Sequence, residues 1–279
     1  MNPTNPLKNF FRQPAIFVKL PSGGQFYPAG ALDMPPNQEI PVYPMTAIDE
    51  ITYRTPDALF NGSAIASVIR SCVPNIKDPW AMPSVDIDTL LVAIRIASNG
   101  HKMGISTTCP SCSHEDEFDI DLRSILEKLK VADYSKTVKS GDLEIFFKPM
   151  NYKTVNDNSQ AQFEEQRILQ QIAANASQTA PDFNRLTDAL RKITEITIDA
   201  LSASIVNIRT PESMVNESAH ISEFLHNCDR RLFNQIRDHV VKSKQESELE
   251  PLQLKCTECN FEYKQAFTLD MSNFFEVAS

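Results

Sequence analysis

Two pairs of cysteines, far apart in the sequence, constrain the fold of this chain most. Cys109 and Cys112 form one C-x-x-C motif, and Cys256 and Cys259 form another. Two residues between the cysteines of a pair let both sulfur atoms face one tight turn, and two such turns supply the four ligands of a tetrahedral zinc ion. We therefore predict one structural zinc ion per chain, held by four thiolates that leave no coordination position open for water.

Other uses of these cysteines stay open at the level of the sequence. A redox dithiol usually needs a single C-x-x-C motif, at the junction of a strand and a helix. Structural disulfides would require secretion, and residues 1–6 contain no apolar signal region, so we expect a protein kept in a reducing cytoplasm. His114 follows the first pair closely and could replace one cysteine as a ligand.

A similar segment follows each cysteine pair. Residues 118–122 and 267–271 both read aromatic, polar, aliphatic, acidic, aliphatic. This alternation predicts a strand with one apolar face. Two matching halves, each a cysteine turn followed by a strand, predict a zinc ribbon that ties the end of the chain to its middle. Residues 113–255 would then be an insertion within the ribbon.

Helices are expected through much of the chain before the first cysteine pair. Thr46 and Asn61 are expected to cap the first two helices. A third helix is expected to start at Ser84 or Asp86 and to end at Asn99, before a glycine.

The chain changes character after the first cysteine pair. Residues 137–149 predict a β hairpin around Gly141. Apolar positions spaced three and four apart then predict a helix at 154–175, a second from about 182 to 209, and two more after Pro211. The first two are expected to pair as a helical hairpin, whose apolar stripe serves either as internal core or as an assembly surface.

Together these features predict an α+β protein that is mostly helical, with a small zinc-ribbon-like β module closed by the two distant C-x-x-C turns. Four segments are expected. They are an extended proline-rich N-terminal arm at 1–45, a helical segment with the first zinc knuckle and a β hairpin at 46–150, a helical insert at 151–245, and the second zinc knuckle with a C-terminal strand at 246–279. The arm is either a cover for the helical core or a surface laid on a partner.

Charge and composition narrow the classes of function. A net charge of −9 argues against a general nucleic-acid binder, which needs a basic face. No apolar run approaches the roughly 18 residues of a membrane span. The seven glycines form no nucleotide-binding motif. His226 and Cys228 are two positions apart on a predicted helix and so face different sides, and helix capping explains Asp86 and Asp88. We therefore expect no enzyme activity, no nucleic-acid partner and no membrane partner.

Several short segments, most of them between residues 20 and 125, carry a resemblance to a known family. They are 20–23 with 26–27, 44–50, 56–59 with 61–62, 90–100 and 109–112. In this order they resemble the baseplate hub proteins of T-even-type contractile-tailed bacteriophages, whereas 151–245 and the second cysteine pair fit only loosely. The resemblance implies a hub component or hub-assembly factor that binds other hub or tail proteins. It implies a location in the host cytoplasm during assembly, and leaves open whether the protein then stays in the virion tail baseplate or leaves.

Two other functions remain open. One is a zinc-ribbon adaptor of transcription or replication machinery, which the acidic balance disfavours. The other is a thiol oxidoreductase, which would need one cysteine pair to turn over an exposed disulfide.

Overall fold

The computed structural model describes residues 5–55, 61–130, 132–175 and 183–267. In these residues, helices alternate with small antiparallel sheets, three of two strands and one of four, which agrees with the predicted α+β class. The chain divides into two compact units. Unit 1 is Met1–Pro79, Val85–Lys130 and Glu248–Ser279, and unit 2 is Trp80–Ser84 and Val131–Ser247. The predicted helical insert at 151–245 falls within unit 2, and the finer division into four segments stays a prediction.

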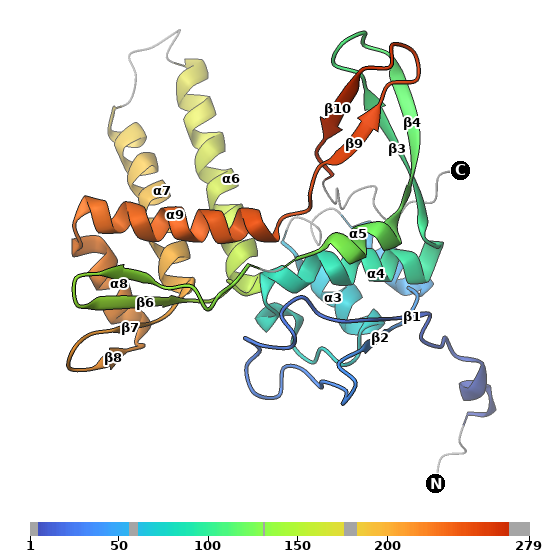
Figure 1. Cartoon of the computed structure of the whole chain (residues 1–279), viewed down its shortest axis with the longest axis horizontal. Coiled ribbons are helices and arrows are strands. Elements are labelled where there is room, and N and C mark those ends of the chain that lie inside the picture. Colours follow the sequence, from blue (N-terminus) through green and yellow to red (C-terminus); the bar gives the residue numbers. More distant parts are fainter. Residues whose placement is uncertain (1–4, 56–60, 131, 176–182, 268–279) are drawn as a thin grey trace. The chain divides into compact units, whose positions relative to one another are not determined.

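In its described residues, unit 1 contains the strands β1 and β2, four α-helices and both cysteine hairpins (Figure 1). Its elements are η1 (Pro6–Phe10), β1 (Ile16–Val18), β2 (Ile40–Val42), α1 (Ala47–Tyr53), α3 (Ser63–Cys72), α4 (Ile87–Asn99), β3 (Lys102–Thr108), β4 (Glu115–Asp121), α5 (Leu122–Lys128), β9 (Leu252–Lys255) and β10 (Glu262–Gln265). Short 3₁₀ turns, η2 (Pro79–Ala81) and η3 (Ser84–Asp86), lie between α3 and α4.

The core of unit 1 forms around α4, in which every residue from 89 to 95 is buried. The antiparallel strands β1 and β2 contact this helix and bury Val18, Ile40 and Val42. Helix α3 also contacts α4 and adds Ile69 to the buried residues. The two strands therefore cover the helical core, one of the two roles expected for the N-terminal arm.

The starts of the helices follow the predicted caps only in part. Thr46 caps α1 as predicted: its hydroxyl accepts a hydrogen bond from the Asp49 N–H at 3.3 Å, and the Asp49 carboxylate accepts from the Thr46 N–H at 2.7 Å. The prediction for α3 is wrong by one residue. Gly62 is the N-cap, with a φ of 73° that glycine adopts without strain, while the Asn61 side chain accepts from the Ser63 N–H.

Removing the Thr46 cap is expected to destabilise unit 1 modestly. Thr46→Ala leaves the Asp49 N–H without its side-chain acceptor and should lower the free energy of unfolding by about 1 kcal/mol. Urea denaturation would measure the change. Ser67→Ala, at an exposed position of α3, is the matched control and should leave stability unchanged or slightly higher. Equal losses in both variants would contradict the capping role.

Asp86 is the N-cap residue of α4, as expected for the start of this helix, but its side chain makes no capping hydrogen bond, so side-chain capping does not explain this residue. Its carboxylate instead accepts hydrogen bonds from the N–H of Ser22 at 2.8 Å, from the hydroxyl of Ser22 at 2.6 Å and from the hydroxyl of Tyr27 at 3.0 Å. Asp86 is 0% exposed. It therefore fastens the loop at 22–27 to the start of α4.

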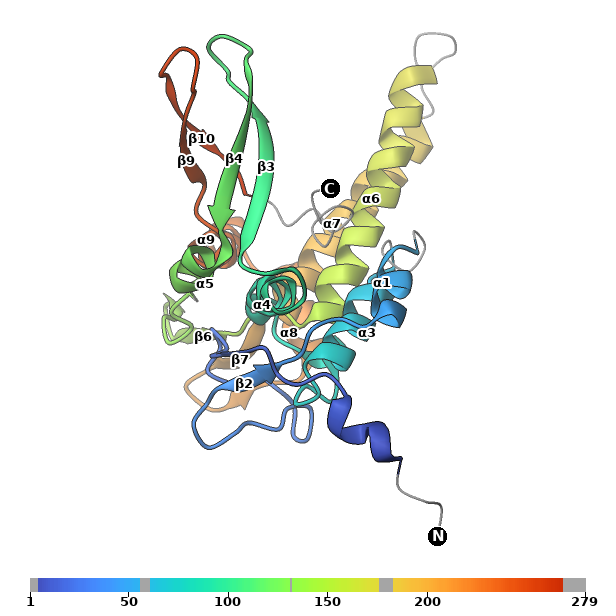
Figure 2. The same cartoon turned by 90° about the vertical axis from the view of Figure 1, so that its right-hand side faces the viewer.

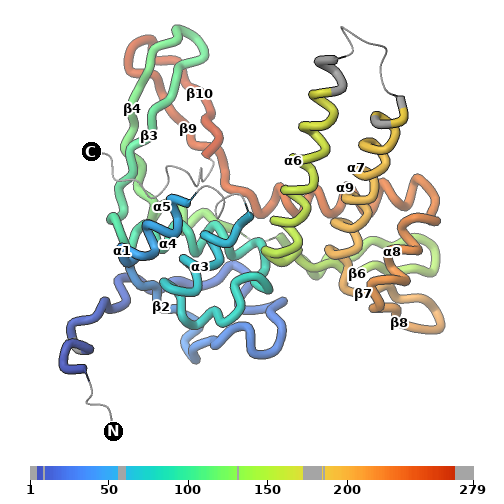
Figure 3. The backbone as a smooth tube through the Cα atoms, turned by 180° about the vertical axis from the view of Figure 1, so that it is seen from behind, coloured from blue at the N-terminus to red at the C-terminus, as the bar shows by residue number. Residues whose placement is uncertain are grey.

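Unit 2 combines a four-stranded antiparallel sheet with four helices. Its elements are β5 (Val138–Ser140), β6 (Leu143–Phe147), α6 (Tyr152–Asn175), α7 (Phe183–Ala203), β7 (Ile205–Arg209), β8 (Met214–Val215), α8 (Ser218–Asn227) and α9 (Arg230–Ser247). Helices α6 and α7 run side by side, as Figures 1 and 3 show, and so form the predicted helical hairpin. The predicted β hairpin at 137–149 is confirmed by the pairing of β5 with β6.

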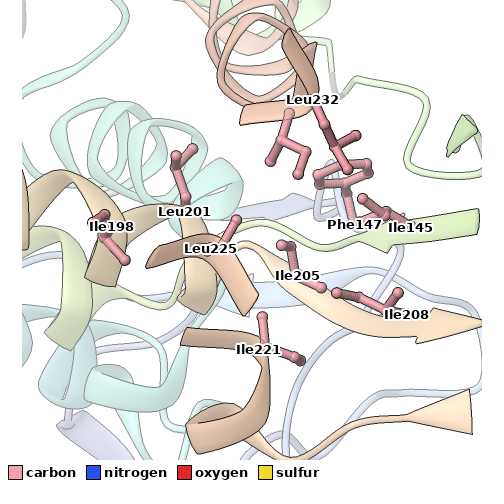
Figure 4. Packing of buried hydrophobic residues seen from close by; sticks show 10 residues of the cluster. Ile145, Phe147, Ile198, Leu201, Ile205, Ile208, Ile221, Leu225 and Leu232 are labelled. Carbon is pink, nitrogen blue, oxygen red and sulfur yellow. The ribbon is translucent and has the colours of Figure 1, made fainter. Parts of the chain in front are cut away.

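The prediction of a helix to residue 209 is wrong, because α7 ends at Ala203 and β7 follows it. Ile205 and Ile208 are β-branched, which favours strand, and they pair with Phe147 and Ile145 of β6. All four side chains are buried in the core of unit 2, shown in Figure 4. The other buried members of this core are Ile198, Leu201, Ile221, Leu225, Leu232 and Ile236.

Candidate metal centre

The first cysteine pair lies in the turn of the hairpin formed by β3 and β4. The two strands pair without a shift from Lys102 opposite Asp121 to Thr108 opposite Glu115. Within the turn, the N–H of Cys109 donates to the carbonyl of His114 at 2.8 Å, and the N–H of Ser113 donates back to the carbonyl of Cys109 at 2.9 Å. These bonds fold the cysteine turn tightly over the end of the hairpin.

The second cysteine pair repeats this geometry in the hairpin formed by β9 and β10. The N–H of Cys256 donates to the carbonyl of Phe261 at 3.0 Å, and the N–H of Asn260 donates to the carbonyl of Cys256 at 3.1 Å. Asn260 has a φ of 59°, and Ser113 in the equivalent place of the first turn has a φ of 60°. The structure thus contains the same cysteine turn twice, as the sequence predicted.

The repeated unit differs from the prediction in its strands. Each cysteine turn lies between two strands of a hairpin, with β4 after the first pair and β10 (Glu262–Gln265) after the second. The strand predicted at 267–271 lies outside the described residues from position 268 onward. Phe267 is buried and belongs to no strand.

The two hairpins lie side by side with their cysteine turns at the same end, as Figures 1 and 2 show. The four sulfur atoms lie within 4.8 Å of one another. The sulfur of Cys109 is 3.7 Å from that of Cys259, and the sulfur of Cys112 is 3.6 Å from that of Cys256. The structure therefore brings together the four predicted ligands from positions far apart in the sequence.

These distances suit a metal ion better than a disulfide. Zinc–sulfur bonds of about 2.3 Å place the sulfur atoms of a tetrahedral site about 3.8 Å apart, whereas a disulfide bond measures about 2.05 Å. All four cysteines are free thiols. Cys109 and Cys256 are buried, while Cys112 and Cys259 are exposed. The four thiol donors and the distances between them fit a closed tetrahedral site. Binding of a metal ion by these four residues stays a prediction.

The protonation of the thiols reflects their shared environment. Burial opposes ionisation of Cys109, but the N–H groups of Cys112 and Ser111 and the neighbouring thiols outweigh it and lower its pKa to about 7. For Cys256, the N–H of Cys259 favours the thiolate, yet burial and the sulfur atoms of Cys259 and Cys112 raise its pKa to about 12. Four sulfurs this close cannot all ionise near neutral pH without a cation between them.

Two contacts join the hairpins outside the cysteines, and the sequence did not predict them. The Asp116 carboxylate of β4 accepts hydrogen bonds from the hydroxyl of Thr257 and, at 3.2 Å, from the Thr257 N–H. The hydroxyls of Thr107 in β3 and Tyr263 in β10 are 2.6 Å apart. The hydrogen bonds from Thr257 hold the pKa of Asp116 below its usual range.

A signal for Asp116 is present in the alternation of β4. Residues 115, 117 and 119 are exposed acids, whereas Asp116 shares the inward face with Phe118 and Ile120. An acid at an inward position of a strand calls for a buried hydrogen-bond partner. Which residue supplies that partner follows only from the docking of the second hairpin.

The side chains of the remaining candidate residues are not part of the four-cysteine group. The His114 ring faces Asp116, with its Nε2 3.6 Å from the nearer carboxylate oxygen, and His114 is not in the group of close sulfur atoms. The His226 ring contacts the carbonyl of Ser222, and the Cys228 thiol donates to the carbonyl of Leu225. The two side chains therefore have different partners.

The comparison with known protein families decides the family. The family model of the T4 bacteriophage base plate protein matches residues 14–276. The chain belongs to this family. The match spans described parts of both units and includes both cysteine pairs of this base plate protein, so the family resemblance predicted from the sequence is confirmed and extends beyond residues 20–125. No curated protein and no solved structure gives a significant match.

The chain has a net charge of −9. Among the described helices, none is both long and apolar enough to cross a membrane.

Proposed function

We propose that this protein is a structural component of the baseplate hub, or a factor in the assembly of that hub, and that it acts by binding other hub or tail proteins. The observation that carries the proposal is the family match, which covers residues 14–276 and so includes nearly the whole chain. A role in the virion tail follows from membership of a base plate family.

A zinc ion bound by Cys109, Cys112, Cys256 and Cys259 would stabilise unit 1. Support comes from the sulfur–sulfur distances of 3.6 and 3.7 Å and from the soft thiolate donors, which zinc favours. Such an ion would tie β9 and β10 to β3 and β4. Its role is structural, because four thiolates leave no open coordination position.

Exposed apolar side chains in unit 1 are candidate contacts with partner proteins. Phe10 is 83% exposed, and Phe11 is exposed beside it at the N-terminal end of the described chain. Ile48 is 75% exposed on α1, and Ile51 is exposed one turn further on. Neighbouring exposed apolar side chains are typical of binding sites, so each of these two pairs is among the first residues to test for loss of assembly.

Mass spectrometry of highly purified phage particles tests the proposed role directly. Copies of this chain would be counted against copies of the tail-tube protein. A small, fixed number per particle is expected for a hub component, whereas presence in tail precursors and absence from finished particles is expected for an assembly factor. Absence from both would overturn the proposal and favour the zinc-ribbon adaptor, for which a salt-sensitive shift of DNA would be the next test.

A further inference from the structure

The carboxylate of Asp116 connects the two cysteine hairpins at a position close to both turns. Asp116 lies four residues after Cys112, and Thr257 lies between Cys256 and Cys259 in the second turn. Both the hydroxyl and the N–H of Thr257 donate to Asp116. The Asp116 side chain of the first hairpin therefore holds the backbone of the second hairpin at Thr257, between the cysteines Cys256 and Cys259.

Burial makes this contact a requirement for Asp116. The residue is 4% exposed, and a buried carboxylate is costly unless hydrogen bonds compensate for its lost hydration. Among the residues that the structure describes, the hydrogen-bond donors to its carboxylate are Thr257 and Cys256 of the second hairpin, and the His114 ring faces it from the first. If the second turn moved away, these hydrogen bonds would be lost, so the docked arrangement of the two turns is the one that satisfies Asp116.

Charge balance does not explain a carboxylate at this place. Four thiolates and one zinc ion carry a net charge of −2, so electrostatics alone would favour a lysine or arginine nearby rather than another anion. Hydrogen-bond geometry explains it, because a carboxylate accepts from a hydroxyl and an N–H at the same time. The function of Asp116 is therefore to be sought in the placement of Thr257.

We propose that Asp116 is a positioning residue that docks the second cysteine turn against the first, so that the four thiols are arranged before a metal ion binds. The Thr107–Tyr263 contact supports the same docking from the other strands of the two hairpins. This inference rests on the proposed metal site. Residues that hydrogen-bond around metal ligands commonly orient those ligands, and the inference assigns this role to Asp116.

The metal affinity of the full-length protein tests this role. Zn²⁺ and Co²⁺ affinities would be measured by competition with a chelator for the wild type, Asp116→Ala, Asp116→Asn and Glu117→Ala. Loss of an outer-shell partner typically weakens metal binding roughly 10- to 100-fold, which is the result expected for Asp116→Ala. Asp116→Asn keeps one acceptor oxygen and should give an intermediate loss. Glu117→Ala removes the exposed neighbouring acid and should bind as the wild type does.

Two further readouts separate positioning from a general loss of stability. A double-mutant cycle with Thr257→Val should show that the effects of Asp116→Ala and Thr257→Val on affinity are not additive, because both variants remove the hydrogen bond from the Thr257 hydroxyl to the Asp116 carboxylate. Mild diamide oxidation of the metal-free protein, followed by peptide mass spectrometry, should give Cys109–Cys259 and Cys112–Cys256 disulfides in the wild type. Asp116→Ala should shift the products toward disulfides within each pair.

The outcomes distinguish this inference from the metal site itself. If neither the wild type nor Glu117→Ala binds metal, the proposed zinc site fails, and the disulfide pattern of the metal-free protein still decides whether Asp116 docks the turns. If the wild type binds metal and Asp116→Ala matches it in affinity and in disulfide pattern, the positioning role is overturned. An equal loss of metal affinity in Glu117→Ala would also overturn it, because the effect would then come from the removal of a negative charge on β4 and not from the hydrogen bonds of Asp116.

Discussion

Replacing Cys256 with serine is expected to abolish stable metal binding and to release the C-terminal hairpin. Cys256 is buried and contributes one of the four close sulfur atoms. A serine hydroxyl stays protonated near neutral pH and is a poor zinc ligand, so three thiolates would remain. Elemental analysis of the pure, reduced protein should give one zinc per chain for the wild type and close to none for Cys256→Ser.

The loss of the ion should also lower the stability of unit 1. An ion present at 1,000 times its dissociation constant stabilises the folded state by about 4 kcal/mol, which corresponds to a fall of roughly 10 °C in the melting temperature of a domain of this size. A chelator added to the wild type should produce a similar fall, and should have little further effect on the variant. Thermal unfolding followed by circular dichroism would measure both.

Cys228→Ser is the matched control for this experiment. Cys228 is a partly buried thiol in unit 2, and its sulfur contacts the carbonyl of Leu225 at 3.6 Å. The control variant should retain its full zinc content. A reduced wild-type protein without zinc, or an equal loss of metal in the two variants, would refute the proposed four-cysteine centre.

The cysteine centre could be predicted from the sequence because its information is local. The C-x-x-C spacing fixes how two sulfurs share one turn, so two motifs predict four ligands without knowledge of the rest of the fold. Asp116 and Thr257 were missed for the opposite reason. Their contact depends on how one hairpin docks on another that is distant in sequence, and no spacing rule describes that docking.

The same distinction explains why two local features of the fold were predicted correctly and the end of α7 was not. The capping of α1 by Thr46 depends on residues three apart, and the β5–β6 hairpin depends on a turn at Gly141. The strand β7 depends on pairing with β6, which is about 60 residues earlier in the chain. Its apolar spacing continues that of α7, so the periodicity extended the helix to residue 209, whereas the long-range pairing ends it at Ala203.

Replacing Asp86 with alanine is the second change with a large expected effect. The variant leaves the N–H and hydroxyl of Ser22 and the hydroxyl of Tyr27 without their acceptor in a buried place. Each unsatisfied buried group costs about 1–3 kcal/mol, and relaxation of the loop recovers part of this, so we expect a loss of about 3 kcal/mol in the free energy of unfolding. Urea denaturation at neutral pH would measure it.

Asp86→Asn provides the control and a test of the charge on this residue. Burial raises the pKa of Asp86, so folding favours its protonated form. The part of the stability that is linked to protonation of Asp86 is therefore fully present below its unfolded pKa of about 4 and is lost as the pH rises through its folded pKa. The hydrogen bonds that Asp86 accepts from Ser22 and Tyr27 do not require the proton. Asparagine resembles the protonated acid, so this variant should keep most of the stability lost in Asp86→Ala and should lack this pH dependence. A loss below about 1 kcal/mol in Asp86→Ala would show that the loop at 22–27 is held by its other contacts.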